Sequence, residues 1–111
     1  MLILEDSGYK KLKADHKLIV NKAITKLEHI ILGMNDFTEF VANNPAIHDS
    51  YDDFYVYKYL TKGFSVRILY RYDDELEIHR FHFKKGDRDN SKYIEDFEDY
   101  VSSYYKQPQR R

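Results

Sequence analysis

Cationic and imidazole side chains concentrate in residues 54–101, where apolar and polar residues also alternate. This alternation predicts three antiparallel strands with basic residues on neighbouring strands. Such a surface suits the phosphodiester of a nucleic acid, because Lys and Arg form charged hydrogen bonds with phosphate oxygens. The residues that define this region are Lys58, Arg67, His79, His82, Lys84 and Lys85.

Charge is unevenly divided along the chain, although the net charge is only −1. Residues 1–53 contain six Lys and Arg against nine Asp and Glu, whereas residues 54–92 contain nine against six. A locally basic region on an otherwise acidic protein favours polyanion binding at one place over nonspecific coating. The alternative is that these charges lie on solvated strand faces.

Length and composition narrow the class of protein. The 111 residues include no Cys, which excludes disulfides, thiolate metal sites and a Cys nucleophile. We expect one domain over residues 1–105 and a flexible basic tail at 106–111. The chain lacks the apolar run of a signal peptide or a membrane span. We therefore expect a cytoplasmic protein without membrane association, metal or cofactor.

The first half of the chain has the pattern of a scaffold. Apolar residues recur at helical spacing from Val20 to Ile31 and predict an amphipathic helix that ends at Gly33. A second, shorter helix is expected over residues 35–44, forming a helical hairpin with the first. The apolar segment at residues 2–4 is expected to be an edge strand.

Alternation in the central strand assigns its side chains to faces. Val66, Ile68 and Tyr70 share one face, which we expect to pack against the first helix. Arg67 lies on the other face of this strand, and we expect it to be solvent-accessible.

The last strand and the closing helix follow the same analysis. His79 and His82 are three residues apart, so a regular strand would place them on opposite faces, with Arg80 and Lys84 on the face of His82. Residue 90 or 91 is expected to cap the final helix. The residues that this helix is expected to bury are Ile94, Phe97, Val101 and Tyr104.

The predicted order of elements is β-α-α-β-β-β-α, which is an α+β fold. It has a small, mainly antiparallel sheet, a helical hairpin on one face and a C-terminal helix. We expect all the helices to lie on one side of the sheet. This order and the local sequence resemble the RelE/ParE superfamily of bacterial toxins, specifically the RelE-like mRNA interferases of type II toxin–antitoxin systems. The segments that carry the resemblance are Tyr57-Lys58, Lys62-Gly63-Phe64, Val66-Arg67-Ile68-Leu69-Tyr70, His82-Phe83-Lys84-Lys85-Gly86-Asp87-Arg88, and Tyr93.

The resemblance implies a toxin-type endoribonuclease, an RNA-binding hydrolase that cleaves mRNA on the ribosome and is held inactive by a cognate antitoxin protein. The RNA 2′-hydroxyl attacks its own phosphodiester in this mechanism, which requires a base, an acid and cations but no metal. By resemblance, the catalytic candidates are Arg67, Lys85, His82 and Tyr93, and the substrate-binding candidates are Lys58, Lys84 and Arg88.

The resemblance also implies roles for these residues. Arg67 contacts the scissile phosphate, and Lys58 binds phosphate or acts as the base. Tyr93 stacks on a nucleobase or assists proton transfer. The ordinary pKa range of His82 suits acid–base work near neutral pH.

Three features depart from the family. Val56 stands where relatives often have a second strand lysine, the turn before Arg67 is two residues longer, and the net charge is slightly acidic rather than strongly basic. The superfamily also includes gyrase-poisoning branches. A noncatalytic protein-binding module and a gyrase-directed toxin on the same fold therefore stay open as alternatives.

Overall fold

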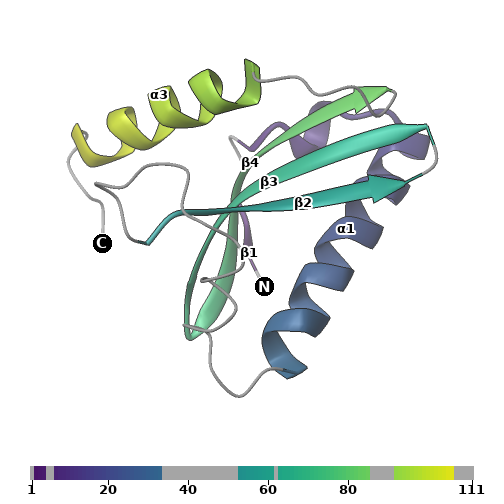
Figure 1. The fold of residues 1–111 in the computed structure, drawn as a ribbon, viewed down its shortest axis with the longest axis horizontal. Helices are drawn as coiled ribbons and strands as arrows, with labels where there is room; N and C mark the ends of the chain where they lie inside the picture. The colour runs from purple at the N-terminus through teal and green to yellow at the C-terminus, as the bar shows by residue number, and fades with distance from the viewer. Residues whose placement is uncertain (1, 5–6, 34–52, 62, 86–91, 107–111) are drawn as a thin grey trace.

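Over the residues that the structure describes, four strands, two α-helices and a short 3₁₀ helix form an α+β arrangement (Figure 1). The computed structural model describes residues 2–4, 7–33, 53–61, 63–85 and 92–106. Along the chain the elements are β1 (Leu2–Ile3), the short 3₁₀ helix η2 (Tyr9–Lys11), α1 (Ala14–Gly33), β2 (Tyr55–Thr61), β3 (Phe64–Asp73), β4 (Glu75–Lys85) and α3 (Lys92–Lys106).

The strands form one sheet in the order β1-β4-β3-β2. β2, β3 and β4 are joined by two consecutive antiparallel hairpins, as the alternation predicts. β1 pairs in parallel with β4 at the sheet edge, which confirms the expected N-terminal edge strand. Gly63, in the β2–β3 turn, has a φ of 90°, and Asp74, in the β3–β4 turn, has a φ of 64°. Gly adopts positive φ without strain, and Asp is among the few other residues that tolerate it.

α1 covers one face of the sheet and forms the larger core with it. Val66, Ile68 and Tyr70 of β3 are fully buried in the cluster that includes Ile24 and Leu27 of α1. This arrangement confirms the face predicted for these strand residues. Burial of each Ile or Leu side chain contributes roughly 1.5–3 kcal/mol, so this packing fixes both the helix and the register of β3.

α3 covers the opposite face, so the expectation that the helices lie on one side of the sheet is wrong. Leu69 of β3 and Phe54, just before β2, are fully buried in a second cluster with Phe97 and Val101 of α3. Because Leu69 and Phe54 make part of this second face apolar, it also needs a cover, and one helix cannot cover both faces.

The buried stripe of α3 is also turned relative to the prediction. Phe97 and Val101 are buried as expected, but Ile94 is 38% exposed. Tyr93 packs against the second cluster in its place, together with Tyr100 and Tyr104. Aromatic rings therefore supply most of the contact between α3 and the sheet.

A β-bulge interrupts the pairing of β3 with β4. Leu69 pairs with Arg80 and Tyr70 pairs with Ile78, so His79 is the extra residue. The bulge resets the alternation of β4, and both His79 and His82 consequently face α3. The prediction that the two imidazoles lie on opposite faces is wrong for this reason. Arg80 shares the α3 face with His82, as predicted.

Several expectations lie outside the described residues. They are the second helix over residues 35–44, the cap at residue 90 or 91, Arg88, and the tail after residue 106. Neither α1 nor α3 is long and apolar enough to cross a membrane.

Candidate functional site

Three of the predicted site residues lie side by side across the sheet. Lys58 of β2 pairs with Arg67 of β3, and Arg67 pairs with His82 of β4. We call Lys58, Arg67 and His82 the Arg67 row. The row lies on the face that α3 covers, and Tyr93 of α3 lies over its centre. The sheet register therefore brings together a lysine, an arginine and a histidine that are distant in sequence.

Arg67 is buried, which corrects the expectation that it is solvent-accessible. Its exposed fraction is 7%, because α3 covers this face of the sheet. The Nη1 atom donates a hydrogen bond to the hydroxyl oxygen of Ser65 at 2.6 Å. The guanidinium carbon lies 5.1 Å from the centre of the Tyr93 ring, a cation–π distance.

The charge on Arg67 has no carboxylate partner in the part of the chain that the structure describes. A buried cation without a counter-ion is unfavourable, because one hydroxyl and one ring face replace its hydration only in part. An anion would form charged hydrogen bonds with the guanidinium. The arrangement therefore favours an anionic ligand at Arg67.

His82 is half-buried beside this charge. Burial is the main cause that lowers its pKa from the ordinary 6.5, and the Arg67 and Lys84 charges lower it further. The carboxylate of Asp96 on α3 opposes them and raises the pKa. The imidazole is therefore neutral at physiological pH, the form that accepts a proton in general-base catalysis.

The remaining predicted residues divide between the two faces. Lys84 pairs with Ser65 on the α3 side and acts electrostatically on His82. Lys85 is exposed and pairs with Phe64, whose ring contacts Phe83 on the α1 side. Alternation therefore places Lys85 away from the Arg67 row, and the catalytic role predicted for it lacks a place in this site.

Tyr93 fits both interpretations considered for it. Its ring packs edge-on against Phe97 at 5.7 Å between centroids, which is a core contact. The same ring lies 6.2 Å from the His82 ring and over Arg67. Tyr93 is thus part of the α3 packing and also lies close to both Arg67 and His82.

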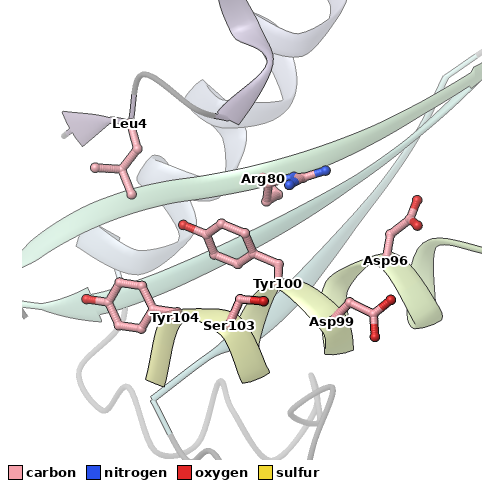
Figure 2. Close-up of a pocket in the computed structure, with 7 residues that line it drawn as sticks. All are labelled: Leu4, Arg80, Asp96, Asp99, Tyr100, Ser103 and Tyr104. Atoms are coloured by element: carbon pink, nitrogen blue, oxygen red, sulfur yellow. The ribbon is translucent and has the colours of Figure 1, made fainter. Parts of the chain in front are cut away.

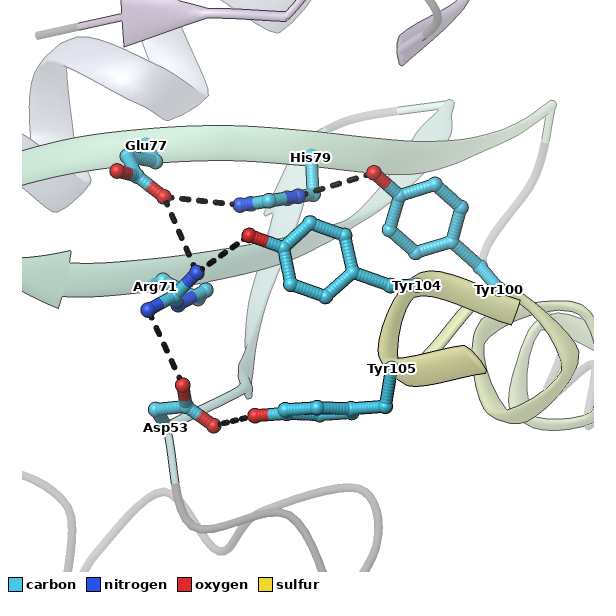
Figure 3. Close-up of polar contacts among 7 residues, drawn as sticks. All are labelled: Asp53, Arg71, Glu77, His79, Tyr100, Tyr104 and Tyr105. Atoms are coloured by element: carbon cyan, nitrogen blue, oxygen red, sulfur yellow. Dashed lines mark hydrogen bonds and ion pairs between the residues drawn. The ribbon is translucent and has the colours of Figure 1, made fainter. Parts of the chain in front are cut away.

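A second polar cluster, which the sequence did not reveal, lies farther along the same face (Figure 3). It joins charged residues of the sheet to tyrosine hydroxyls near the end of α3. We call it the α3 network. Its members are Asp53, Arg71, Glu77, His79, Tyr100, Tyr104 and Tyr105.

His79 is the centre of the α3 network and is only 1% exposed. Its Nε2 atom lies 3.0 Å from a Glu77 carboxylate oxygen, and its Nδ1 atom lies 3.0 Å from the Tyr100 hydroxyl. Both ring nitrogens therefore have partners despite the burial. Glu77 and His79 are two residues apart, so alternation places them on the same face of β4, the face that α3 covers.

Arg71 connects the other half of the network. It forms an ion pair with Asp53 at 3.1 Å and donates a hydrogen bond to the Tyr104 hydroxyl at 2.7 Å. The Tyr105 hydroxyl donates to Asp53, and burial together with this bond raises the pKa of Tyr105. Only the Nε atom of Arg71 is buried without a partner in this network. These contacts hold the last turns of α3 on the sheet.

A polar pocket of about 550 Å³ opens between β4 and α3 (Figure 2). Two of its residues, Tyr100 and Tyr104, also belong to the α3 network. A third, Asp96, also raises the pKa of His82. Its walls are formed by Leu4, Arg80, Asp96, Asp99, Tyr100, Ser103 and Tyr104.

The described residues contain no group of three or more His, Asp or Glu side chains placed to hold a metal ion. Comparison of the chain with family models, curated proteins and solved structures gives no match. The assignment of the candidate site therefore rests on the positions and contacts of its residues in this structure.

Proposed function

We propose that this protein is a toxin-type endoribonuclease that cleaves mRNA, with the Arg67 row as its phosphate site. The observation that carries the proposal is the buried guanidinium of Arg67, which no carboxylate neutralises among the described residues. Single-stranded RNA presents one negative charge per nucleotide and would supply the missing counter-ion. Lys58 and His82 on either side of Arg67 would meet the same phosphodiester.

The proposed reaction is metal-independent attack by the RNA 2′-hydroxyl. The 2′-oxygen forms a bond to phosphorus while the bond from phosphorus to the 5′-oxygen breaks. Neutral His82 accepts the proton of the 2′-hydroxyl, and the Tyr93 hydroxyl donates a proton to the leaving 5′-oxygen. Arg67 and Lys58 stabilise the negative charge on the nonbridging oxygens. The products are a 2′,3′-cyclic phosphate and a 5′-hydroxyl end.

Tyr93 limits access to this site. Its ring covers the Arg67 guanidinium, so a phosphate that contacts Arg67 must displace the ring. We propose that mRNA held on the ribosome is the substrate, because a fixed substrate geometry removes much of the entropic barrier to reaction. A cognate antitoxin that covers this face would keep the enzyme inactive. The resemblance of the sequence to the RelE/ParE superfamily supports both partners.

The test is induced expression in a bacterium, followed by mapping of RNA ends. The wild-type protein should arrest growth and create 5′-hydroxyl ends within translated messages. His82→Gln keeps the approximate size of the side chain but removes the base, and it should lower cleavage by about 10²–10⁴-fold. Lys13→Ala removes an exposed lysine just before α1, the helix that covers the opposite face of the sheet, and is the control.

Two results would overturn the proposal. One is growth arrest without new RNA ends, which would mean that toxicity has another cause. The other is wild-type cleavage by His82→Gln and Arg67→Lys, which would place the chemistry elsewhere. Circular dichroism melting of each purified variant separates lost chemistry from lost folding.

A second candidate, a noncatalytic protein-binding module, is favoured by an apolar groove of about 700 Å³ along the outer side of α1. Leu18 is 64% exposed at this groove, and Lys22 and Lys26 lie beside it. Exposed apolar surface with a charged rim is typical of protein contacts. Toxicity that survives His82→Gln but is lost in Leu18→Asp would support this candidate over the enzyme.

A further inference from the structure

The pocket between β4 and α3 has an unusual combination of walls (Figure 2). Arg80 contributes a guanidinium, Asp96 and Asp99 contribute two carboxylates, and Tyr100 and Tyr104 contribute aromatic rings. Donors, acceptors and ring faces therefore surround one cavity of about 550 Å³. The mechanism proposed above does not use this cavity.

The walls of the pocket are held in place by the protein itself. The Tyr100 hydroxyl is hydrogen-bonded at 3.0 Å to His79, which is buried and bonded in turn to Glu77. The guanidinium of Arg80 lies 5.4 Å from the centre of the Tyr100 ring. The Tyr104 ring is nearly parallel to that of Tyr100, at 27° and 6.3 Å. A ligand would meet walls that are already ordered, which lowers the entropic cost of binding.

We propose that this pocket binds a guanine base of single-stranded RNA. Guanine presents two neighbouring acceptors, O6 and N7, which match the N–H groups of Arg80. Its N1–H and N2–H₂ donors match a carboxylate of Asp96 or Asp99, which accepts two hydrogen bonds. The tyrosine rings supply the stacking surfaces that unpaired bases use in RNA recognition.

The other bases fit this set of groups less well. Adenine presents an acceptor, N1, beside its amino group, so a carboxylate meets a lone pair instead of a second donor. Cytosine and uracil lack the N7 acceptor that guanine offers beside O6. An unmatched carboxylate or guanidinium in the pocket would lose hydration without replacement. The pocket therefore selects by hydrogen-bond pattern as well as by shape.

The pocket lies close to the Arg67 row. The link between the pocket and the row rests on the proposed function. Arg80 precedes His82 by two residues on the same face of β4, a rise of about 6.6–6.8 Å. Asp96 lines the pocket and also acts on the pKa of His82. A guanine in the pocket would belong to a nucleotide next to the phosphate at Arg67.

Binding of GMP and AMP to the purified protein tests the inference without any need for cleavage. The two nucleotides share ribose and phosphate, so a difference between them reports on the base. GMP should change the amide chemical shifts of residues 96–104. The affinity for GMP obtained from these changes should be at least tenfold higher than the affinity for AMP. The double variant Asp96→Asn/Asp99→Asn and Arg80→Lys should each lose this preference. Glu95→Gln removes an exposed carboxylate of α3 outside the pocket and should keep it.

Equal binding of GMP and AMP, or no shift in residues 96–104 with either nucleotide, would overturn the guanine pocket. Mapping of the RNA ends then separates this inference from the proposed function. Cleavage without guanine beside the cut would overturn the pocket and leave the endoribonuclease in place. GMP-selective binding without cleavage would support the pocket and refute the enzyme.

Discussion

The Arg67 row and the α3 network lie on the same face of the sheet, under the same helix. They differ in whether their buried charged side chains have polar partners. In the network, Arg71 is matched by Asp53 and by the Tyr104 hydroxyl, and both nitrogens of His79 have partners. In the row, Arg67 has one serine hydroxyl and one ring face. Matched groups stabilise a fold, whereas an unmatched cation is unfavourable to the fold and available to a ligand. The buried charges under one end of α3 are therefore paired within the protein, whereas Arg67 under the other end is paired with no carboxylate among the described residues.

Among the variants that test the contrast between the two regions, Arg67→Met has the largest expected effect. Cleavage should fall by about 10²–10³-fold, because the transition state loses a charged donor. The free energy of unfolding should stay unchanged or rise, because an apolar side chain of similar length replaces an uncompensated buried charge. Cleavage assays on ribosome-bound mRNA and denaturant unfolding measure the two quantities.

Arg71→Met is the matched change in the α3 network. It should lower the free energy of unfolding by about 1–3 kcal/mol, because partly buried partners lose their hydrogen bonds and ion pair. If both arginine variants change stability equally, the contrast between the two regions is wrong.

His79→Leu should destabilise the protein by about 1–3 kcal/mol, because the substitution leaves the Tyr100 hydroxyl and the Glu77 carboxylate without their buried partner. Denaturant unfolding measures the loss. Tyr100→Phe should recover part of it in the double variant, since the hydroxyl that bonded His79 is then absent. A His79→Leu protein as stable as the wild type would show that the network contributes little.

Salt dependence distinguishes the two neighbouring lysines at the end of β4. Lys84→Gln should reduce the slope of log affinity for single-stranded RNA against log salt by about 0.7, the value for one lost phosphate contact. Lys85→Gln should leave the slope unchanged, because alternation places it on the α1 side. Binding measured from low to moderate salt gives both slopes. Equal slopes for the two variants would show that strand face does not define the RNA surface.

The smallest effect is the titration of His82. Its folded pKa lies below 6.5, so the unfolded chain binds more protons in this window and stability rises with pH through it. In nuclear magnetic resonance titrations Asp96→Asn should lower this pKa further, and Lys84→Ala should raise it. The acid limb of the pH–rate profile should move with the titration. A limb that stays fixed while the His82 titration moves would remove His82 as the base.

The sequence predicts the strands and the α1 core well, because these depend on regular periods. Val66, Ile68 and Tyr70 bury against α1 as alternation requires. The pairing of Lys58 with Arg67 follows from the short β2–β3 turn, whereas the pairing of Arg67 with His82 also requires the bulge at His79. Regular alternation therefore specifies only part of the candidate row.

The burial of Arg67 was missed because it depends on a distant segment. The stripe of α3 can be drawn through Ile94 or through Tyr93, and only the packing against Leu69 selects Tyr93. That choice places a ring over Arg67 and changes an exposed cation into a buried one. Tertiary contacts, rather than helix propensity, therefore determine which side of α3 is buried and whether Arg67 is exposed.

The α3 network was missed because it depends on contacts between the sheet and a distant helix. A bulge has no period, so alternation also failed to place His79 and His82 on one face. The pairs Glu77 with His79 and Tyr100 with Tyr104 are visible in the sequence as spacings of two and four residues. Neither spacing indicates that the sheet and the helix would bring them together.

The bulge also identifies the residue of β4 that is not needed for pairing with β3. Ile78 and Arg80 pair with adjacent residues of β3, so the chain with His79 deleted would form an unbroken ladder with every other side chain on its present face. His79 is in this sense an insertion that the sheet tolerates and the α3 network uses. We expect a protein lacking this one residue to keep its strand pairing in hydrogen-exchange measurements while the end of α3 loses protection. A deletion that unfolds the whole sheet would contradict this.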